Sequence, residues 1–380
     1  MDNVAVIGAG PAGLQTALRI KEEGFTASVY EEDQAIGSPE NCSGLISRSG
    51  VDELGLDLEE CLQNEIKGAN IYSPNGTKIT VTRPSNVAYV VDRKKFDKGL
   101  ARNAARAGIN VQTGTKLIDV RKTSLFLETG GRGELKKAEH VVGADGARST
   151  VRHIMGKDVP KENFVHSVQA LCVGDFRKEM VDVYLGDYAR GFFAWVIPVD
   201  KTHAKVGLGC RVGENISENF KRFVSEKVKP MRVGRVQSSL IPYGLPLEGI
   251  QKDNLSIVGD AAFHTKATSG GGIIFGMKAG NILGGAIANH IKHKTPLNLY
   301  EREMAGINRE LKMHWKVRQY INSLGGESID KLFGKLKEKG IEEFLQMEGD
   351  MDSPSKFIGK MAKSPKYWFM AKTLLGIARS

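Results

Sequence analysis

The sequence predicts an α/β protein in which a parallel sheet is combined with a second, antiparallel sheet and a helical C-terminal region. Residues 3–31 place an apolar run, a glycine-rich turn, a helix-forming segment and a second apolar run in succession, which is the pattern of a βαβ unit. Short β-branched runs recur in 66–91 and 165–212 and are typical of antiparallel sheets. Beyond Pro296, helix formers with dense Lys and Glu predominate.

Length and composition limit the possible classes of protein. With 380 residues, a prior of about 150 residues per domain predicts two or three domains. No apolar run approaches the ~18 residues that a membrane span needs, and no apolar leader precedes the first strand, so we expect a cytoplasmic protein. The four cysteines are far apart and predict free thiols without a metal site. The formal net charge of +10 suits an anionic substrate, an anionic membrane surface or nucleic acid.

The glycine-rich turn predicts a dinucleotide site. Gly8, Gly10 and Gly13 form a G-x-G-x-x-G pattern. The first permits a tight turn, the second lets the backbone approach a pyrophosphate, and the third lets the helix from Pro11 pack closely on the strand. Glu31 ends the next apolar run, where a carboxylate can accept hydrogen bonds from both ribose hydroxyls. A purely structural turn is the alternative, but strand, turn, helix and acid together favour the dinucleotide.

The segments after the βαβ unit contain two further candidates for the site. Residues 37–50 are rich in turn formers and predict an irregular loop. Cys42 in this loop is either a thiol that faces a substrate or a small buried hydrophobic residue. Asp92 is the expected N-cap of a helix over 98–107. Arg93, next to that cap, either reaches the cofactor or remains a solvated charge.

The middle of the chain is expected to alternate between the two sheets. The Asn-Gly pair at 75–76 predicts a hairpin in a second, antiparallel layer that starts at about residue 66. Residues 109–142 are expected to return to the first sheet. The aromatic segment 184–199 either lines an apolar pocket or forms ordinary core.

The stretch 254–293 completes the expected cofactor site. A strand delivers Asp260 to its carboxyl end, where ligands bind in open α/β sheets. The helix that follows starts at Gly270–Gly272, whose free N–H groups can stabilise negative charge on a flavin ring. A dinucleotide held at two helix N-termini predicts FAD rather than a transient NAD.

These motifs together resemble the aromatic-hydroxylase class of FAD proteins over about residues 1–295. Within that class, Pro-Glu-Asn-Cys-Ser-Gly at 39–44 and Gly-Phe-Phe-Ala-Trp-Val-Ile-Pro at 191–198 are similar to the geranylgeranyl reductase family, particularly the archaeal enzymes that saturate digeranylgeranylglycerophospholipids. The resemblance implies a Rossmann-like FAD-binding domain with an inserted antiparallel-sheet substrate domain and a C-terminal helical region. The implied FAD-binding segments are 1–65, 93–160 and 251–295, the substrate-domain segments are 66–92 and 161–250, and the helical region is 296–380.

The resemblance also implies roles for individual residues. Glu31 would bind ribose, Arg93 and Asp260 the ribityl-pyrophosphate portion, and Gly271 and Gly272 the flavin edge. The full set of expected cofactor-binding residues is Gly8, Gly10, Ala12, Gly13, Glu31, Cys42, Arg93, Val120, Asp260, Gly271, Gly272 and Ile273. The expected substrate-binding residues are Phe192, Trp195 and Tyr243.

Cys42 matches the cysteine of the family's loop near the flavin, so it is the expected catalytic residue. Two segments depart from the family pattern: residues 264–268 read His-Thr-Lys-Ala-Thr where relatives often carry proline, and Phe192 and Phe193 stand where tyrosines are common. These departures concern the placement of the flavin and the shape of the substrate site.

The implied activity is reduction of isolated prenyl double bonds. Reduced FAD gives a hydride to one carbon, and the other carbon takes a proton from Cys42, His264, Tyr243 or water. The alternative on the same scaffold is a flavin monooxygenase or halogenase that acts on an apolar substrate. Ferredoxin, NAD(P)H or another reduced carrier is the expected electron donor.

The remaining expectations concern partners and location. Lys and Arg are dispersed and no nucleic-acid motif is present, so we expect no nucleic-acid partner. The segment 367–379 has aromatic and apolar residues with cations at its ends. It either packs on the domain as a helix or lies on an acidic lipid surface, which would place the protein at the inner face of the cell membrane.

Overall fold

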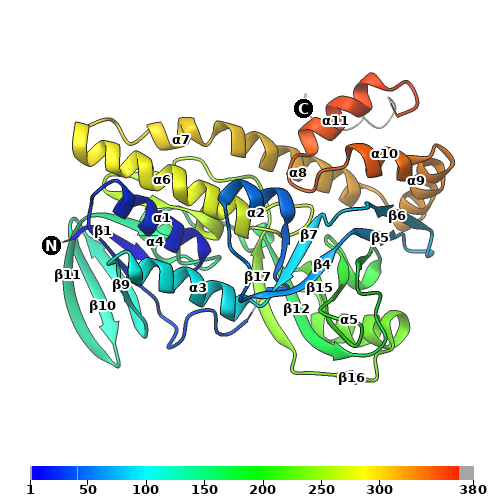
Figure 1. Ribbon diagram of the computed structural model, residues 1–380, viewed down its shortest axis with the longest axis horizontal. Helices are drawn as coiled ribbons and strands as arrows, with labels where there is room; N and C mark the ends of the chain where they lie inside the picture. The colour runs from blue at the N-terminus through cyan, green and yellow to red at the C-terminus, as the bar shows by residue number, and fades with distance from the viewer. Residues whose placement is uncertain (1, 41, 368–380) are drawn as a thin grey trace.

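The N-terminal unit is built on a mainly parallel sheet. In the computed structural model, which describes residues 2–40 and 42–367, β1 (Asp2–Ile7) lies in the middle of this sheet and pairs in parallel with a strand on each side (Figure 1). The strand order is β18-β19-β11-β1-β2-β8. The bounds are β2 (Ala27–Tyr30), β8 (Asn110–Gln112), β11 (Arg132–Gly143), β18 (Gln251–Lys252) and β19 (Leu255–Ile257). Residues 109–142 therefore return to the first sheet, as expected.

Two helices beside this sheet pack closely on each other. These are α1 (Pro11–Glu22) and α6 (Ile273–His293). A Cβ added to Gly280 of α6 would lie 2.5 Å from the carbonyl oxygen of Ala12, so only glycine allows this approach. A Cβ on Gly276 would meet the side chain of Ala12 at 3.3 Å. Small residues thus bring the N-terminal ends of the two helices together.

An antiparallel extension projects from the same sheet. β9 (Thr115–Arg121) and β10 (Ser124–Thr129) form a hairpin, and β10 continues onto β11. The helix expected over 98–107 is α3 (Arg93–Arg106), which begins earlier than predicted. The carboxylate of Asp92 accepts a hydrogen bond from the backbone N–H of Lys95 at 3.0 Å, which confirms Asp92 as the N-cap.

The second sheet has the order β16-β12-β15-β14-β13-β5-β6, with β17 also paired to β12. Its pairs are antiparallel except for β5 with β13. The Asn-Gly hairpin is confirmed between β5 and β6. The bounds are β5 (Gly68–Tyr72), β6 (Lys78–Thr82), β12 (Phe164–Val173), β13 (Met180–Tyr184), β14 (Ala194–Pro198), β15 (His203–Arg211), β16 (Arg232–Val233) and β17 (Gln237–Pro242). The helix α5 (Ile216–Phe223) covers one face of this sheet.

A small third sheet lies between the two larger ones and was not predicted. It consists of β3 (Leu45–Ser47), β4 (Leu62–Ile66) and β7 (Ala88–Val91). The expectation of an irregular loop over 37–50 was therefore wrong beyond residue 44, because β3 is followed directly by α2 (Arg48–Leu54). The prediction that all strands over 66–91 belong to the second sheet was also wrong for β7.

The C-terminal region is helical, as expected. Figure 1 shows α6, α7 (Leu299–Glu303) and α8 (Ala305–Ser323) following one another along the upper edge of the molecule. The helices α9 (Gly326–Glu338) and α10 (Ile341–Glu348) lie at the end near β6, and α11 (Pro354–Lys363) packs on α8. The expected last helix falls mostly on residues 368–380, outside the described part of the chain. None of the described helices has the length and apolar composition needed to cross a membrane.

Candidate active site

A cavity of about 1460 Å³ runs between the parallel sheet, the second sheet and the C-terminal helices. Ligand pockets of about 300–1,000 Å³ are typical, so this cavity has room for more than one ligand. Its lining includes most residues expected at the site, namely Gly10, Ala12, Cys42, Arg93, Phe192, Trp195, Asp260, Gly271, Gly272 and Ile273. The sequence therefore identified residues that the fold does bring together.

The three glycines of the N-terminal turn differ in how much space their surroundings leave for a side chain. A Cβ on Gly13 would lie 2.1 Å from the carbonyl oxygen of Gly8, and one on Gly8 would lie 2.3 Å from that of Ala144. Gly8 also has φ +103°, a conformation that favours glycine. A Cβ on Gly10 would meet no atom of the described chain within 4 Å. Packing thus explains Gly8 and Gly13, whereas the open space before Gly10 suits a bound group.

Glu31 lies beside this turn at the end of β2. Its Oε2 accepts a hydrogen bond from the backbone N–H of Ala9 at 2.7 Å, and its Oε1 accepts one from Asp33 at 3.0 Å. Burial raises the pKa of this carboxyl group, while the two backbone donors act in the opposite direction. Glu31 is therefore fixed next to the glycine turn, where the sequence predicted a ribose contact.

Arg93 is held by a buried carboxylate. Its guanidinium donates to Asp97 through two nitrogens, at 3.1 and 2.8 Å, and both side chains are largely buried. Burial acts to lower the pKa of Arg93, but Asp97 and the neighbouring Cys42 more than offset this and raise it. The cation is thus permanent and rigidly oriented, and it lies beside the thiol of Cys42.

Asp260 faces the same region from the other side. It follows β19, within the short helical turn Gly259–Ala262. Burial raises its pKa, whereas the hydroxyl of Thr265, which donates at 2.9 Å, and the charge of Arg93 act to lower it. A Cβ on Gly272 would lie 2.8 Å from Asp260 Oδ1, so glycine is needed where α6 begins.

These features fit FAD. The open turn at Gly10, the oriented cation Arg93 and the uncapped start of α6 all line the cavity, and the acid Glu31 is held beside that turn by the N–H of Ala9. Free N–H groups at helix starts, a cation and a ribose-binding acid are the groups that a dinucleotide needs. Among the described residues, no group of three or more His, Cys, Asp or Glu side chains is arranged to hold a metal ion.

The loop that carries Cys42 is anchored by a contact that the sequence did not reveal. Glu40 accepts from the buried Nζ of Lys205 in β15 at 2.8 Å. Gly44 has φ +72°, and a Cβ there would lie 2.2 Å from the carbonyl oxygen of Val91. The Sγ of Cys42 accepts a hydrogen bond from the N–H of Gly44 at 3.4 Å. Cys42 is therefore held at the cavity wall between the cofactor side and the second sheet.

The second sheet gives the cavity an apolar wall. The strand register places Trp195, Val183, Ile71 and Ile79 in one row across β14, β13, β5 and β6, and Ile197, Val181, Ala69 and Val81 in the next. All eight residues line the cavity. Apolar residues of the C-terminal region between 321 and 358 also line the cavity, namely Ile321, Leu324, Ile329, Leu332, Phe333, Leu336, Ile341, Leu345, Phe357 and Ile358.

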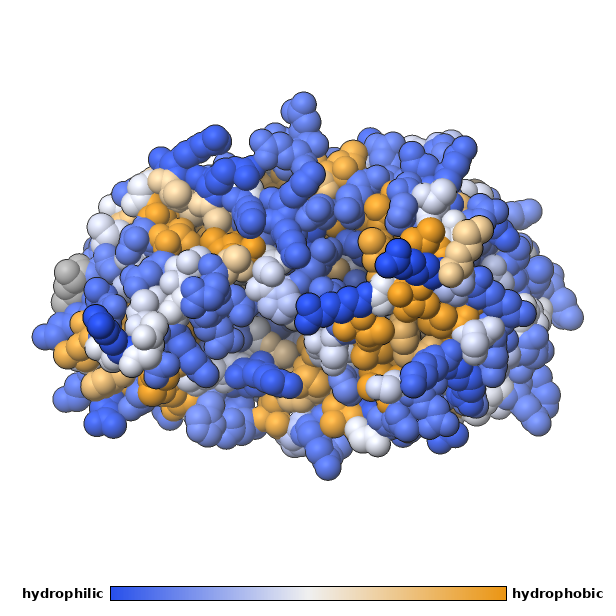
Figure 2. Space-filling view, turned by 90° about the horizontal axis from the view of Figure 1, so that it is seen from below, coloured by the Kyte–Doolittle hydropathy of each residue, from blue (hydrophilic) through white to orange (hydrophobic). Residues whose placement is uncertain are grey.

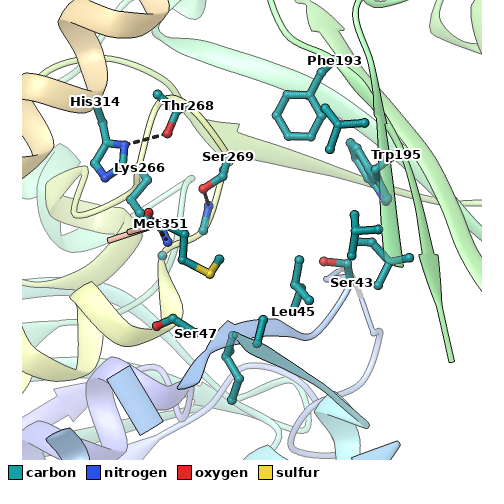
Figure 3. Close-up of a pocket in the computed structure, with 18 of the residues that line it drawn as sticks. Ser43, Leu45, Ser47, Phe193, Trp195, Lys266, Thr268, Ser269, His314 and Met351 are labelled. Atoms are coloured by element: carbon teal, nitrogen blue, oxygen red, sulfur yellow. Dashed lines mark hydrogen bonds between the residues drawn. The ribbon is translucent and has the colours of Figure 1, made fainter. Parts of the chain in front are cut away.

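Aromatic residues mark the end of this wall near the cofactor side. Phe192 and Phe193 stack at 4.2 Å between ring centroids, and Phe193 meets Trp195 edge-on at 5.7 Å. The indole Nε1 of Trp195 donates to Gln169 at 3.0 Å. Figure 3 shows Phe193 and Trp195 across an open space from the segment Lys266–Ser269.

Some expected site residues are not among those that line the cavity. Val120 is a residue of β9, and its side chain is buried in the core under that strand. Tyr243 lies behind Phe192, with ring centroids 6.1 Å apart, and its hydroxyl donates to the carbonyl oxygen of Gly191 at 3.0 Å. Tyr243 therefore supports the aromatic wall from outside.

Sequence reasoning missed a buried arginine from the C-terminal region. Arg318 in α8 donates to the carbonyl oxygens of Ala267 at 3.0 Å, Thr268 at 2.6 Å and Phe192 at 3.2 Å. Its guanidinium also lies over the ring of Phe192, 5.1 Å from the centroid. Burial lowers its pKa to about 10, so it stays charged at neutral pH. Arg318 joins the loop before α6 to the aromatic wall.

A second missed contact joins the C-terminal region to the cofactor side. Lys266 and Asp352 form a buried ion pair at 2.5 Å, and the hydroxyl of Ser47 also donates to Asp352. Burial alone would raise the pKa of Asp352, but Lys266 and Ser47 lower it overall. Figure 3 places Lys266 and Ser47 at the edge of the cavity, near Met351.

His264 does not have the properties of a proton donor. It is fully buried, and its Nδ1 accepts from the backbone N–H of Gly259 at 3.2 Å. Burial lowers its pKa from 6.5 to about 3, and it does the same for His140 and His314. The folded protein therefore holds these three imidazoles neutral at any pH near 7.

These histidines predict a loss of stability in mild acid. The unfolded chain takes up a proton at each imidazole near pH 6.5, whereas the folded chain does not, so stability is complete above that pH and falls as the pH decreases toward 3. Each imidazole is expected to cost about 2 kcal/mol of unfolding free energy between pH 7 and pH 5. In His264→Asn, the Oδ1 of asparagine can replace Nδ1 as the acceptor. Between pH 7 and pH 5, the unfolding free energy of this variant, measured in urea, should therefore decrease by about 2 kcal/mol less than that of the wild type. An unchanged dependence would contradict the argument.

Comparison with known proteins agrees with this site. Residues 1–242 match the family model described as an FAD binding domain. The chain is 31% identical over 357 residues to a digeranylgeranylglycerophospholipid reductase from Methanocaldococcus jannaschii, covering 88% of this chain and 90% of the relative.

Solved structures share the fold. A geranylgeranyl bacteriochlorophyll reductase-like protein from Thermoplasma acidophilum superposes with a TM-score of 0.87 at 23% identity and covers 99% of both chains. A flavin-dependent halogenase matches less well, with a TM-score of 0.68 at 19% identity, covering 83% of this chain and 63% of that one. The family match confirms FAD as the cofactor, and the chain belongs to the FAD-binding-domain family and, within it, to the family that includes the digeranylgeranylglycerophospholipid reductases.

Proposed function

We propose that the protein saturates the isoprenoid double bonds of geranylgeranyl chains carried by digeranylgeranylglycerophospholipids. The observation that carries this proposal is the pair of apolar rows across β14, β13, β5 and β6, which extend from the cofactor side toward α9–α11. A long, unbranched apolar wall suits an extended prenyl chain. The relative from Methanocaldococcus jannaschii, named for this substrate, supports the assignment.

The chemistry needs alignment, a dry pocket and a proton. When bound and reduced, FAD supplies a hydride to one carbon of the alkene. An isolated alkene offers no carbonyl group to polarise, so the apolar rows contribute by holding the double bond in place and excluding water. The second carbon needs a proton from a positioned acid. Cys42 is our proposed donor because it lies in the cavity lining beside Arg93, whereas His264 and Tyr243 are outside that lining.

This role predicts a specific effect of substituting Cys42. Replacing it with Ala is expected to lower the turnover number by about 10²–10⁴-fold, the usual contribution of a general acid, with little change in FAD content. Replacing it with Ser should recover part of the rate and enlarge the solvent isotope effect. Cys210→Ala provides the matched control, since that thiol is buried among β-strands of the second sheet. Wild-type turnover in Cys42→Ala would show that water or another group delivers the proton.

The length of the apolar cavity predicts that a bulky side chain in its wall blocks long substrates but not short ones. Ala69 on β5 lines the cavity between Val181 and Val81. Ala69→Phe would place a ring in the path of the chain, so reduction of a full geranylgeranyl lipid should fall by about tenfold or more, while a shorter geranyl analogue is still reduced. Product mass spectra and flavin absorbance would check this. Equal rates on the long and short substrates would contradict a chain that extends along this wall.

Partners and location follow from the proposed substrate. A lipid-linked prenyl chain requires contact with a membrane, so the protein would act as a peripheral protein on the inner face of the cell membrane. Ferredoxin, NAD(P)H or another reduced carrier would supply electrons. A halogenase or monooxygenase on the same scaffold would require oxygen, so an anaerobic product with added hydrogens distinguishes the reductase from both.

A further inference from the structure

We propose that residues 227–236, together with Leu171, form a membrane-docking surface at the mouth of the cavity, which binds the anionic headgroups of a lipid bilayer. We call these residues the docking segment. The proposal rests on the proposed function, because it assumes that the substrate is a membrane lipid, and it adds where and by what chemistry the protein meets that membrane.

The docking segment exposes apolar side chains that a protein normally buries. Met231 is 86% exposed, Leu171 48%, Val236 47% and Val233 40%. They are close in space because β16 pairs with the end of β12, so that Val233 lies opposite Cys172, and the N–H of Gly234 donates to the carbonyl oxygen of Leu171 at 2.9 Å. Exposed apolar residues gathered in this way indicate an interaction surface.

The same segment is strongly basic. Between Lys227 and Gln237 the chain carries four cations, Lys227, Lys229, Arg232 and Arg235, and no acid. All four are exposed, and none of them forms an ion pair with a carboxylate in the described part of the chain. Figure 2, which views the molecule from the β16 side, shows strongly hydrophilic residues beside a hydrophobic patch on the right-hand half of this face. Cations that surround apolar residues are typical of surfaces that rest on acidic lipids.

The position of the docking segment connects it to the substrate cavity. Side chains alternate along β12, so Ser167, Gln169 and Leu171 share one face. Ser167 and Gln169 line the cavity, and Leu171 is the next residue on that face. On the neighbouring strand, Gln237 lies opposite Gln169 and directly follows Val236. A prenyl chain that leaves the bilayer at Leu171 would therefore pass Gln169 and reach Trp195, to which Gln169 is hydrogen-bonded.

A lipid bilayer explains this combination better than an acidic protein does. An acidic electron carrier would need the cations but not Met231, whose long flexible side chain is almost fully exposed. A bilayer uses both features, since headgroups pair with the cations while the apolar side chains enter the acyl boundary.

Vesicle binding by the FAD-loaded protein tests the proposal. The patch variant is Met231→Asp/Arg232→Glu/Arg235→Glu, and the matched control is Leu135→Asp/Lys136→Glu/Lys137→Glu, which makes the same changes at exposed positions of β11. Wild type and control should bind vesicles of phosphatidylglycerol and phosphatidylcholine. The patch variant should bind about tenfold more weakly or worse, and Arg232→Gln/Arg235→Gln should be intermediate. Thermal unfolding checks that each variant is folded.

The outcomes separate docking from catalysis. In detergent, where no bilayer is needed, the patch variant should reduce the prenyl lipid at the wild-type rate. Vesicle binding by the patch variant equal to wild type would overturn the proposal, and so would binding of an acidic carrier protein through these residues without any binding to vesicles. Patch-dependent vesicle binding by a protein that does not reduce prenyl lipids in detergent would support the docking surface and contradict the proposed function.

Discussion

Arg318→Met is expected to lower the unfolding free energy by about 3 kcal/mol or more and to reduce the FAD content of the purified protein. The substitution leaves the carbonyl oxygens of Ala267, Thr268 and Phe192 without their donor in a buried environment. The loop that contains Ala267 and Thr268 leads directly into the start of α6, so its displacement should disturb the flavin side of the site. Urea unfolding and the ratio of flavin to protein absorbance measure the two effects.

The matched variant Arg318→Lys separates charge from geometry. Lysine keeps the positive charge but lacks the planar fork that reaches three carbonyl oxygens at once, so we expect an intermediate loss of both stability and FAD. A stability of Arg318→Met within about 0.5 kcal/mol of wild type would contradict the role given to this side chain.

Gly10→Ala and Gly13→Ala are expected to fail in different ways. Gly10 has φ −75°, which alanine adopts readily, and an added Cβ meets no described atom within 4 Å. We therefore expect Gly10→Ala to fold with near-wild-type stability but to bind FAD roughly 100-fold more weakly, because the methyl group occupies the space where a pyrophosphate approaches the backbone. Isothermal titration of the FAD-free protein measures this affinity.

Gly13→Ala, in contrast, is expected to disturb the packing of the protein itself. In Gly13→Ala the new Cβ would lie 2.1 Å from the carbonyl oxygen of Gly8, so α1 must move away from the strand. We expect a loss of about 1–3 kcal/mol in unfolding free energy, the usual cost of overpacking. If Gly10→Ala instead destabilised the FAD-free protein as much as Gly13→Ala, the space before Gly10 would not be a ligand site.

The sequence predicted the parts of this site that depend on neighbouring residues. Gly8, Gly10 and Gly13 act within one turn, Asp92 caps the helix that it precedes, and the hairpin at 75–76 joins adjacent strands. Each of these features leaves a local pattern in the chain, since the residues that form it lie only a few positions apart.

The parts that were missed depend on contacts distant in sequence. Lys266 and Asp352 are 86 positions apart, and Arg318 meets Phe192 across 126. Nothing around a lone lysine or arginine indicates which distant backbone or carboxylate it will meet. The apolar rows of the second sheet were equally hidden, because the register that aligns Trp195 with Val183 is fixed only when the strands pair.

In segment 37–50, one part of the prediction was correct and another part was wrong. Its turn formers correctly indicated an irregular stretch up to Gly44, but the strand β3 has only three residues and forms by pairing with β7. Such a short strand gives no alternating pattern of its own. Cys42 was expected near the cofactor from family resemblance, and its position beside Arg93 depends on the distant anchor between Glu40 and Lys205.

One measurement tests the central claim most directly. The FAD-loaded protein would be reduced chemically without oxygen, mixed with a digeranylgeranylglycerophospholipid, and followed by flavin absorbance and by the mass of the lipid. We expect the flavin to reoxidise as the lipid gains two hydrogens for each double bond reduced, and we expect Ala69→Phe to slow both changes together. Reoxidation that occurs only when oxygen is admitted, with oxygen or halogen added to the product, would contradict the reductase and favour the alternative chemistry.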